Sequence, residues 1–212
     1  MSNFTPTVIT ISRQLGSGGT YLGQRLSDKL NLLYLDREIV EKAAAQLGCR
    51  TEQIVSLDEA VISKWKETIN YIASAQKMLY STLEYFPTNT DIFEAEKEVI
   101  VQVVKSKSAI IIGRCGSYLL HNHPRHASIF LHACEDFRIN RIKEMYGISN
   151  DEAAKVIEVT DRSRAHYVHK FTGRDMNDVR QYHLAVDTGV IGLEAAEELI
   201  LNYVNAKFGE CL

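Results

Sequence analysis

Short apolar runs alternate along the chain with longer segments of helical periodicity. The apolar runs are rich in β-branched and aliphatic residues, which is typical of buried strands, and they span residues 8–11, 32–35, 109–112, 128–132 and 184–187. Between them, apolar residues recur at steps of three and four, as on one face of a helix. Because strands that alternate with helices favour a parallel sheet covered on both faces, the pattern predicts a three-layer α/β fold with five parallel strands.

The predicted helices differ in how clearly their ends are marked. Leu22, Leu26 and Leu30 are spaced four apart, on one face of the first predicted helix. A capping box at Ser149–Glu152 predicts the start of a long helix, and Gly147 ends the helix before it. Other helices are expected at about 37–46, 91–105, 137–146 and 193–208.

The stretch 48–90 interrupts the alternation of strands and helices. From Leu57 to Phe86 its pattern is helical, with a surplus of aromatic residues, and Pro87 ends that pattern. We expect an all-helical insertion between sheet elements, whose apolar side chains pack against the other helices of this lobe. A wall for a stacked base and a dimer face are the alternatives.

The first strand runs directly into a glycine-rich turn that opens the first helix. Backbone N–H groups at such a turn point outward, the helix dipole favours negative charge, and glycine lets a phosphate approach closely. Within the phosphate-loop pattern G-x-x-x-x-G-K-[ST], Gly18 and Thr20 fit, whereas Gly19 stands at the lysine position and Arg13 at the first glycine position. The turn predicts an anion site, with an ordinary strand-to-helix turn as the alternative.

Charged residues follow two other predicted strands, where ligands of open α/β sheets bind. The charged triplet Asp36-Arg37-Glu38 can face a substrate, and Asp36 can also cap the next helix. Arg114 lies between glycines after the third strand. A guanidinium there suits bidentate phosphate contact, and an internal salt bridge is the alternative.

The segment from Asp161 to Arg180 is the most basic in the chain. Arg162 and Arg164 are two residues apart, so on a continuous helix they point to different sides. Both reach one ligand only if it lies across the helix or if the helix ends there. A charge run is usually a solvated face, but beside a phosphate loop it favours a phosphate-clamping lid.

Composition and charge narrow the classes of function. The 212 residues carry a formal net charge of −3, which argues against nucleic acid as a partner, and no apolar run is long enough to span a membrane. Four scattered cysteines without CxxC spacing predict reduced thiols in a cytoplasmic protein. The histidines also lack metal-site spacing.

The order of these motifs resembles that of the cytidylate kinases. The loop GSGGT, the strand end Leu35-Asp36, Gly113-Arg114, the sequence DRSR at 161–164 and AVDT at 185–188 fall in that order, over nearly the whole chain. The resemblance, closest to the divergent cytidylate kinase-like group, implies one P-loop kinase domain over 1–212, with 48–90 as the insertion that binds a nucleoside monophosphate and about 158–181 as a lid. It also implies ATP and Mg²⁺ as cofactors, transfer of the γ-phosphoryl group and a CMP-like acceptor.

The resemblance also implies roles for individual residues at the donor end of the site. Gly16, Ser17, Gly18 and Gly19 would wrap the phosphates of ATP, and Thr20 would contact Mg²⁺. The loop lysine is missing at Gly19, so the resemblance requires another cation. Arg13, at the start of the loop, and Arg25, one turn into the helix, are the candidates.

At the acceptor end, the resemblance assigns Asp36 to the sugar or base, and the neighbouring Arg37 belongs to the same substrate-facing triplet. Arg114 would bind the acceptor phosphate, although Cys115 stands where the typical motif has aspartate. Arg162 and Arg164 would be lid arginines, which Asp161 would position. A nucleotide-binding sensor without turnover, a small-anion-binding domain, and a homodimer formed through the insertion are further hypotheses.

Overall fold

The computed structural model describes residues 5–36 and 90–209. Several sequence-based predictions concern other residues. The helices expected at 37–46 and 57–86, the substrate-facing Arg37, the insertion 48–90 apart from Thr90, and the dimer surface on that insertion lie outside the described residues.

The predicted parallel sheet is present in the described part of the chain. Its five strands run in the order β2-β3-β1-β4-β5, and every neighbouring pair is parallel. They comprise β1 (Val8–Arg13), β2 (Leu33–Leu35), β3 (Ala109–Ile112), β4 (His126–His132) and β5 (Leu184–Asp187). β1 lies at the centre, where Ile11 is in register with Ile112 on one side and with Ile129 on the other. The glycine-rich turn therefore follows the central strand.

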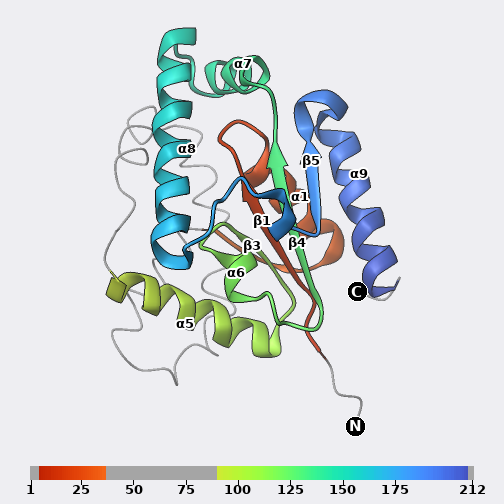
Figure 1. Ribbon diagram of the computed structural model, residues 1–212. Coiled ribbons are helices and arrows are strands. Elements are labelled where there is room, and N and C mark those ends of the chain that lie inside the picture. Colours follow the sequence, from red (N-terminus) through yellow and green to blue (C-terminus); the bar gives the residue numbers. More distant parts are fainter. Residues whose placement is uncertain (1–4, 37–89, 210–212) are drawn as a thin grey trace.

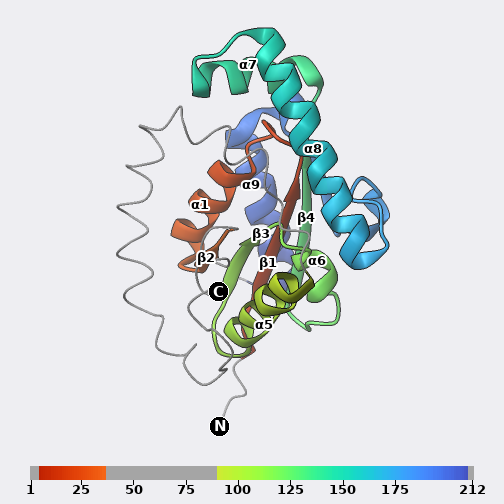
Figure 2. The same ribbon diagram turned by 90° about the vertical axis from the view of Figure 1, so that its left-hand side faces the viewer.

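Helices cover both faces of this sheet, which confirms the three-layer prediction (Figures 1 and 2). α1 (Gly19–Leu30) and α9 (Thr188–Phe208) lie on one face, where Leu22, Leu26 and Ile200 join a core with Ile9 and Ile129. α5 (Thr90–Ser106) and the short α6 (Gly116–Leu119) lie on the other face. There, the α5 residues Val99, Ile100 and Val104 pack against Val8 and Ile111.

α7 (Glu135–Tyr146) lies beyond the carboxyl ends of the strands, and α8 (Asn150–Thr172) runs from there back alongside the sheet toward α5 (Figures 1 and 2). The two helices pack on one another through Ile142, Ala153 and Ile157. The predicted capping box is present, with Ser149 and Glu152 each accepting a hydrogen bond from the backbone of the other. The far end of α8 reaches α5, where the rings of Phe93 and Phe171 are stacked with centroids 4.1 Å apart.

The last helix begins earlier than its apolar periodicity predicts. α9 starts at Thr188, not at Leu193, because Asp187 caps it by accepting from the N–H groups of Gly189 and Val190. Its first turn lies outside the core, since Val190 is 79% exposed. A kink at Gly192 (φ +78°) then turns the helix onto the sheet, where the apolar pattern begins.

Candidate functional site

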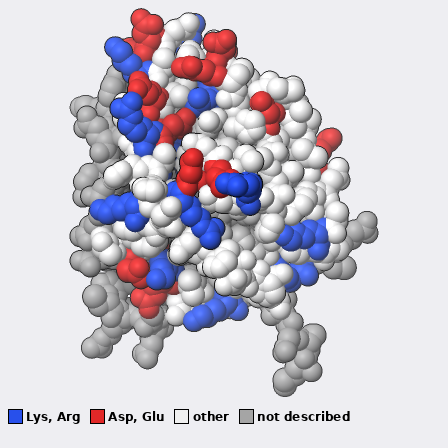
Figure 3. All heavy atoms as spheres, viewed as in Figure 1, with Lys and Arg blue, Asp and Glu red and all other residues white. Residues whose placement is uncertain are grey.

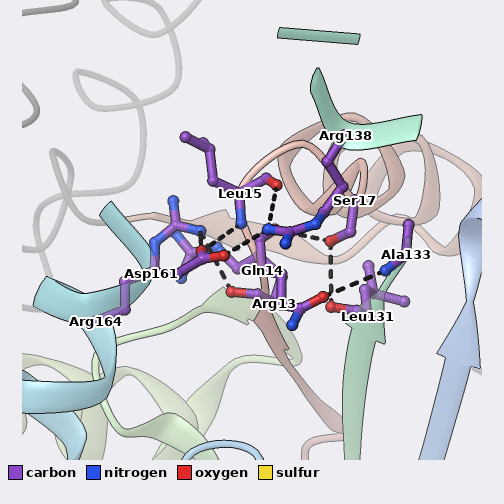
Figure 4. Close-up of polar contacts among 9 residues, drawn as sticks. All are labelled: Arg13, Gln14, Leu15, Ser17, Leu131, Ala133, Arg138, Asp161 and Arg164. Atoms are coloured by element: carbon purple, nitrogen blue, oxygen red, sulfur yellow. Dashed lines mark hydrogen bonds and ion pairs between the residues drawn. The ribbon is translucent and has the colours of Figure 1, made fainter. Parts of the chain in front are cut away.

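The phosphate-loop candidate connects the central strand β1 to α1, at the carboxyl edge of the sheet (Figure 4). Hydrogen bonds hold its shape from within and from β4. The Ser17 hydroxyl donates to the Gln14 carbonyl at 2.8 Å and to the Leu131 carbonyl at 3.2 Å. The Thr188 hydroxyl donates to the Ser17 carbonyl at 2.9 Å. The side chain of Ser17 is thus part of the loop's scaffold, and only its backbone can serve a ligand.

Arg13 runs across this loop between two glycines. A Cβ atom at Gly19 would lie 2.7 Å from Arg13 Cγ, and one at Gly113 would lie 2.3 Å from Arg13 Nη1. Neither glycine position has room for a side chain while the Arg13 side chain keeps this conformation. The Arg13 side chain therefore fills the space of a residue-19 side chain, which is where the phosphate-loop pattern places lysine.

Several predicted site residues surround the Arg13 guanidinium. Burial, followed by the charges of Arg164 and Arg114, lowers the pKa of Arg13 well below its ordinary value, and Tyr34 and Asp36 oppose that shift. The structure thus gathers three guanidiniums and the Asp36 carboxylate at the ends of β1, β2 and β3 and on α8. Like charges held this closely favour a bound anion.

Asp161 joins α7 and α8 to the first half of the loop (Figure 4). Its carboxylate accepts from the Leu15 N–H at 2.7 Å and from Arg138 Nη1 at 2.5 Å, and it lies 3.9 Å from Arg164 Nη1. Arg138 Nη1 also donates to the Leu15 carbonyl at 3.3 Å, and Arg164 Nη1 to the Arg13 carbonyl at 3.3 Å. The two arginines therefore face the loop backbone from separate helices.

Arg162 points away from this cluster, as the two-residue spacing on a continuous helix predicts. Its side chain is 76% exposed and pairs with Glu158 one turn earlier, at 2.6 Å. The face shown in Figure 3 carries acidic and basic side chains interspersed along α8. Residues 158–181, the expected lid, comprise the second half of α8 and a turn that ends in a short 3₁₀ helix at Val179–Gln181.

Arg114 makes the internal salt bridge that the sequence left as the alternative to a ligand role. Its Nη1 donates to Glu96 Oε1 of α5 at 2.7 Å, and both side chains are almost fully buried. Its guanidinium carbon lies 4.6 Å from the centroid of the Tyr167 ring on α8. Arg114 and Cys115 both have positive φ, at +50° and +54°. A role of Arg114 toward a phosphate stays a prediction.

Thr20 is exposed in the first turn of α1, where its side chain contacts the Tyr34 hydroxyl. Burial and the neighbouring Asp36 carboxylate raise the pKa of Tyr34, so its hydroxyl stays protonated. Hydroxyl and carboxylate oxygens are hard ligands that fit Mg²⁺. The described residues contain no group of three His, Cys, Asp or Glu side chains that could bind a metal.

Among the described residues, sequence reasoning missed Arg138, Glu96 and Tyr167 at this site. Glu96 left a usable signal, because a carboxylate lies three residues from Phe93 and four from Ile100 on the apolar side of α5. Arg25, one of the two candidates for the loop cation, instead pairs with the buried Glu197 of α9, which Lys29 also contacts at 2.6 Å. Arg13 remains as the candidate inside the loop.

A five-stranded parallel sheet in the order 2-3-1-4-5, with a glycine-rich loop between its central strand and the first helix, is the fold of the P-loop kinases. More narrowly, the chain belongs to the cytidylate kinase-like family, whose model matches residues 8–190. Within the described residues, no helix is long and apolar enough to cross a membrane.

Two relatives agree with this assignment, and two solved structures are similar in fold. The chain is 26% identical over 205 residues to a cytidylate kinase of Sulfolobus acidocaldarius, with 94% of each protein covered. A cytidylate kinase of Saccharolobus islandicus is 24% identical over 202 residues, covering 94% of this chain and 91% of the relative. An uncharacterized protein from Eubacterium ventriosum shares the fold with a TM-score of 0.71 at 19% identity, covering 94% of this chain and 99% of that one. Shikimate kinase from Bacteroides thetaiotaomicron has a TM-score of 0.50 at 14% identity, covering 94% and 98%.

Proposed function

We propose that this protein is an ATP-dependent nucleoside monophosphate kinase that transfers the γ-phosphoryl group to a CMP-like acceptor. One observation carries the proposal: beside the glycine-rich loop, Arg164 donates to the Arg13 carbonyl at 3.3 Å, and the charges of Arg164 and Arg114 act on the Arg13 guanidinium. Phosphoryl transfer needs little covalent chemistry from the protein, and positioning with charge neutralisation provides most of the catalysis. Arginines suit that task because each can contact a phosphate with two donors.

The donor end of the proposed site is the loop itself. Backbone N–H groups of residues 16–19 would bind the phosphates of ATP, aided by the positive end of α1. Arg13 supplies the cation that Gly19 lacks, because its side chain occupies the space of a residue-19 side chain. The Thr20 hydroxyl would hold Mg²⁺, which neutralises phosphate charge when bound.

The acceptor end lies around the carboxyl ends of β2 and β3. Asp36 would bind the sugar or base, together with Arg37, and Arg114 would contact the acceptor phosphate. An oxygen of that phosphate attacks the γ-phosphorus of ATP, and the bond to the β–γ bridging oxygen breaks, which yields ADP and a nucleoside diphosphate. Arg164 stabilises the charge on the transferring group, and Asp161 positions Arg164 from the same helix.

We assign residues 158–181 to a lid and residues 48–90 to the insertion that binds the monophosphate. Arg162 belongs to this lid and would reach the ligand only if α8 turned, since in this conformation it pairs with Glu158. A nucleotide-binding sensor without turnover is the second candidate. The missing loop lysine favours it, and so does the Asp161 carboxylate, which already engages Leu15 N–H and Arg138.

Turnover separates the two candidates. The full-length protein is mixed with ATP and Mg²⁺, and ADP formation is measured with CMP, dCMP, UMP, AMP or GMP. We expect ADP to accumulate fastest with a cytidine acceptor and to fall about 100-fold in Arg164→Ala, because one lost donor to the transition state costs on the order of 3 kcal/mol. ATP binding without ADP formation for any acceptor would favour the sensor.

A further inference from the structure

A buried three-residue network supports the turn that carries Arg114. The Glu96 carboxylate uses both oxygens: Oε1 accepts from Arg114 Nη1 at 2.7 Å, and Oε2 accepts from the Tyr167 hydroxyl at 2.8 Å. The Tyr167 ring in turn lies against the guanidinium, with Arg114 Cζ 4.6 Å from its centroid. The planar guanidinium of Arg114 thus contacts the Glu96 carboxylate at its edge and the Tyr167 ring at its face.

Stability alone does not explain this arrangement. A buried ion pair roughly breaks even against apolar residues of the same size, because desolvation offsets the attraction. The turn also places two non-glycine residues, Arg114 and Cys115, at positive φ. Such conformations persist only where the surroundings over-determine them, and they cluster at functional sites. The network is therefore better explained by a requirement for one fixed orientation of Arg114.

The same network also anchors α8, at Tyr167, three residues after Arg164. Asp161, Arg164 and Tyr167 follow one another at three-residue steps, so their side chains lie near one another along the helix. Asp161 fastens α8 to the loop through Leu15 N–H, and Tyr167 fastens it to α5 through Glu96. Arg164, between these two anchors, donates to the Arg13 carbonyl at 3.3 Å.

We infer that Glu96 and Tyr167 are positioning residues that hold Arg114 in one orientation toward a phosphate monoester dianion at the acceptor end, and that Tyr167 anchors α8 there. This inference rests on the proposed function, because it concerns the same acceptor site. Glu96 and Tyr167 act through Arg114 and do not contact the reacting atoms. Loss of either residue therefore weakens acceptor binding more than ATP binding.

The Tyr167→Phe variant removes the hydroxyl and keeps the ring. Isothermal titration of the full chain is expected to give a Kd for CMP five- to tenfold higher, with the Kd for Mg-ATP changed less than twofold. Tyr182→Phe is the control, since it also removes one hydroxyl that donates a hydrogen bond, here to the Met176 carbonyl at 2.8 Å, and keeps the ring. The control is expected to leave both dissociation constants within twofold of the wild type.

A double-mutant cycle tests whether Tyr167 acts through Glu96. Glu96→Gln removes the charge and keeps the shape, and we expect it to raise the Kd for CMP about tenfold. In that background, Tyr167→Phe is expected to add less than twofold. Full additivity would overturn the relay through Glu96.

Other outcomes would overturn the positioning role itself. Equal losses for CMP and Mg-ATP, or a lower melting temperature with CMP affinity intact, would make the network a structural brace. If the wild type neither binds CMP nor turns over any monophosphate, the proposed function fails, and inorganic phosphate becomes the probe. An unchanged phosphate Kd in both Tyr167→Phe and Glu96→Gln would then overturn this inference separately.

Discussion

Basic side chains lie both at the carboxyl edge of the sheet, where its parallel strands end, and at the amino edge, where they begin. The two edges differ in whether these side chains stay protonated. At the carboxyl edge, Arg114 and Arg164 lie close enough to Arg13 for their charges to lower its pKa. At the amino edge, His126 is 3% exposed, its Nε2 lies 2.8 Å from the Thr10 hydroxyl, and its ring packs edge-on against His183. Burial, and then the charge of His183, lowers the pKa of His126 to about 3.

The chemistry of the two side chains explains this contrast. An imidazole with so low a pKa simply loses its proton, so the crowding at the amino edge disappears at neutral pH. A guanidinium stays protonated in proteins, so the crowding at the carboxyl edge persists. Carboxylates already relieve part of it, because Arg114 pairs with Glu96 and Arg164 lies near Asp161. His126 is therefore a neutral buried residue at neutral pH, whereas the guanidiniums at the carboxyl edge stay charged.

We expect the largest effect from a substitution at Arg13, at the centre of the carboxyl edge. Arg13→Ala removes the proposed substitute for the loop lysine, and we expect kcat/KM to fall about 10²–10³-fold, or about 3–4 kcal/mol, by analogy with the loss of one transition-state donor. Arg25→Ala is the control, since Arg25 pairs with Glu197 on α9. Steady-state kinetics with varied Mg-ATP measures both variants. Similar rates for Arg13→Ala and the wild type would remove Arg13 from the site.

A smaller effect is expected from breaking the contact of α8 with the loop. Asp161→Ala leaves the Leu15 N–H and the Arg138 guanidinium without their carboxylate, and we expect a loss of about 2–3 kcal/mol in the free energy of unfolding. Urea denaturation measures it. Glu158→Ala is matched on the same helix: its pair with Arg162 is exposed, so its loss should cost less than about 1 kcal/mol. Equal losses would contradict a special role for Asp161.

The amino edge predicts a pH dependence of stability. The folded-state pKa of His126 is depressed to about 3, so below about pH 6.5 the unfolded chain binds a proton that the folded chain excludes. Stability from this residue is therefore complete above about pH 6.5 and falls by on the order of 1 kcal/mol per pH unit below it. Denaturation between pH 7 and 4 should show a shallower decline in His126→Gln than in the wild type. The exposed His166 of α8, changed to Gln, should leave the slope as it is.

The smallest expected effect concerns Arg162. Because its side chain is 76% exposed and paired with Glu158, we expect Arg162→Ala to lower kcat less than about threefold, within the free energy typical of an exposed ion pair. Steady-state assays compare it directly with Arg164→Ala. A loss as large as that of Arg164→Ala would show that α8 turns during the reaction and brings Arg162 to the ligand.

The sheet was predictable because each strand is a compact run of β-branched or aliphatic residues, such as the segment Ala109–Ile112. The ends of helices were less predictable. α9 starts where Asp187 caps it, five residues before its apolar pattern begins at Leu193. The glycine loop and the charged strand ends located the candidate site, because parallel strands present their carboxyl ends at one edge.

Contacts between distant segments could not be predicted. Asp161 meets Leu15 across 146 positions of sequence, and Tyr167 meets Glu96 across 71. Local patterns report which face a residue occupies, but not which residue of another element faces it. The salt bridge of Arg114 could not be predicted, because Arg114 lies in the turn after β3 and its partner Glu96 lies on α5.

The shared space of Arg13 and Gly19 restricts how this loop can change over evolution. A side chain at position 19 would meet Arg13 near its backbone end, at Cγ, where rotation of the side chain offers little relief. Gaining a lysine at 19 before losing the arginine would create a clash and a second cation, whereas losing the arginine first would leave no cation in the loop. Neither order passes through an intermediate with one well-placed charge. The two residues therefore form an epistatic pair, and descendants of this sequence would be expected to keep both or exchange both.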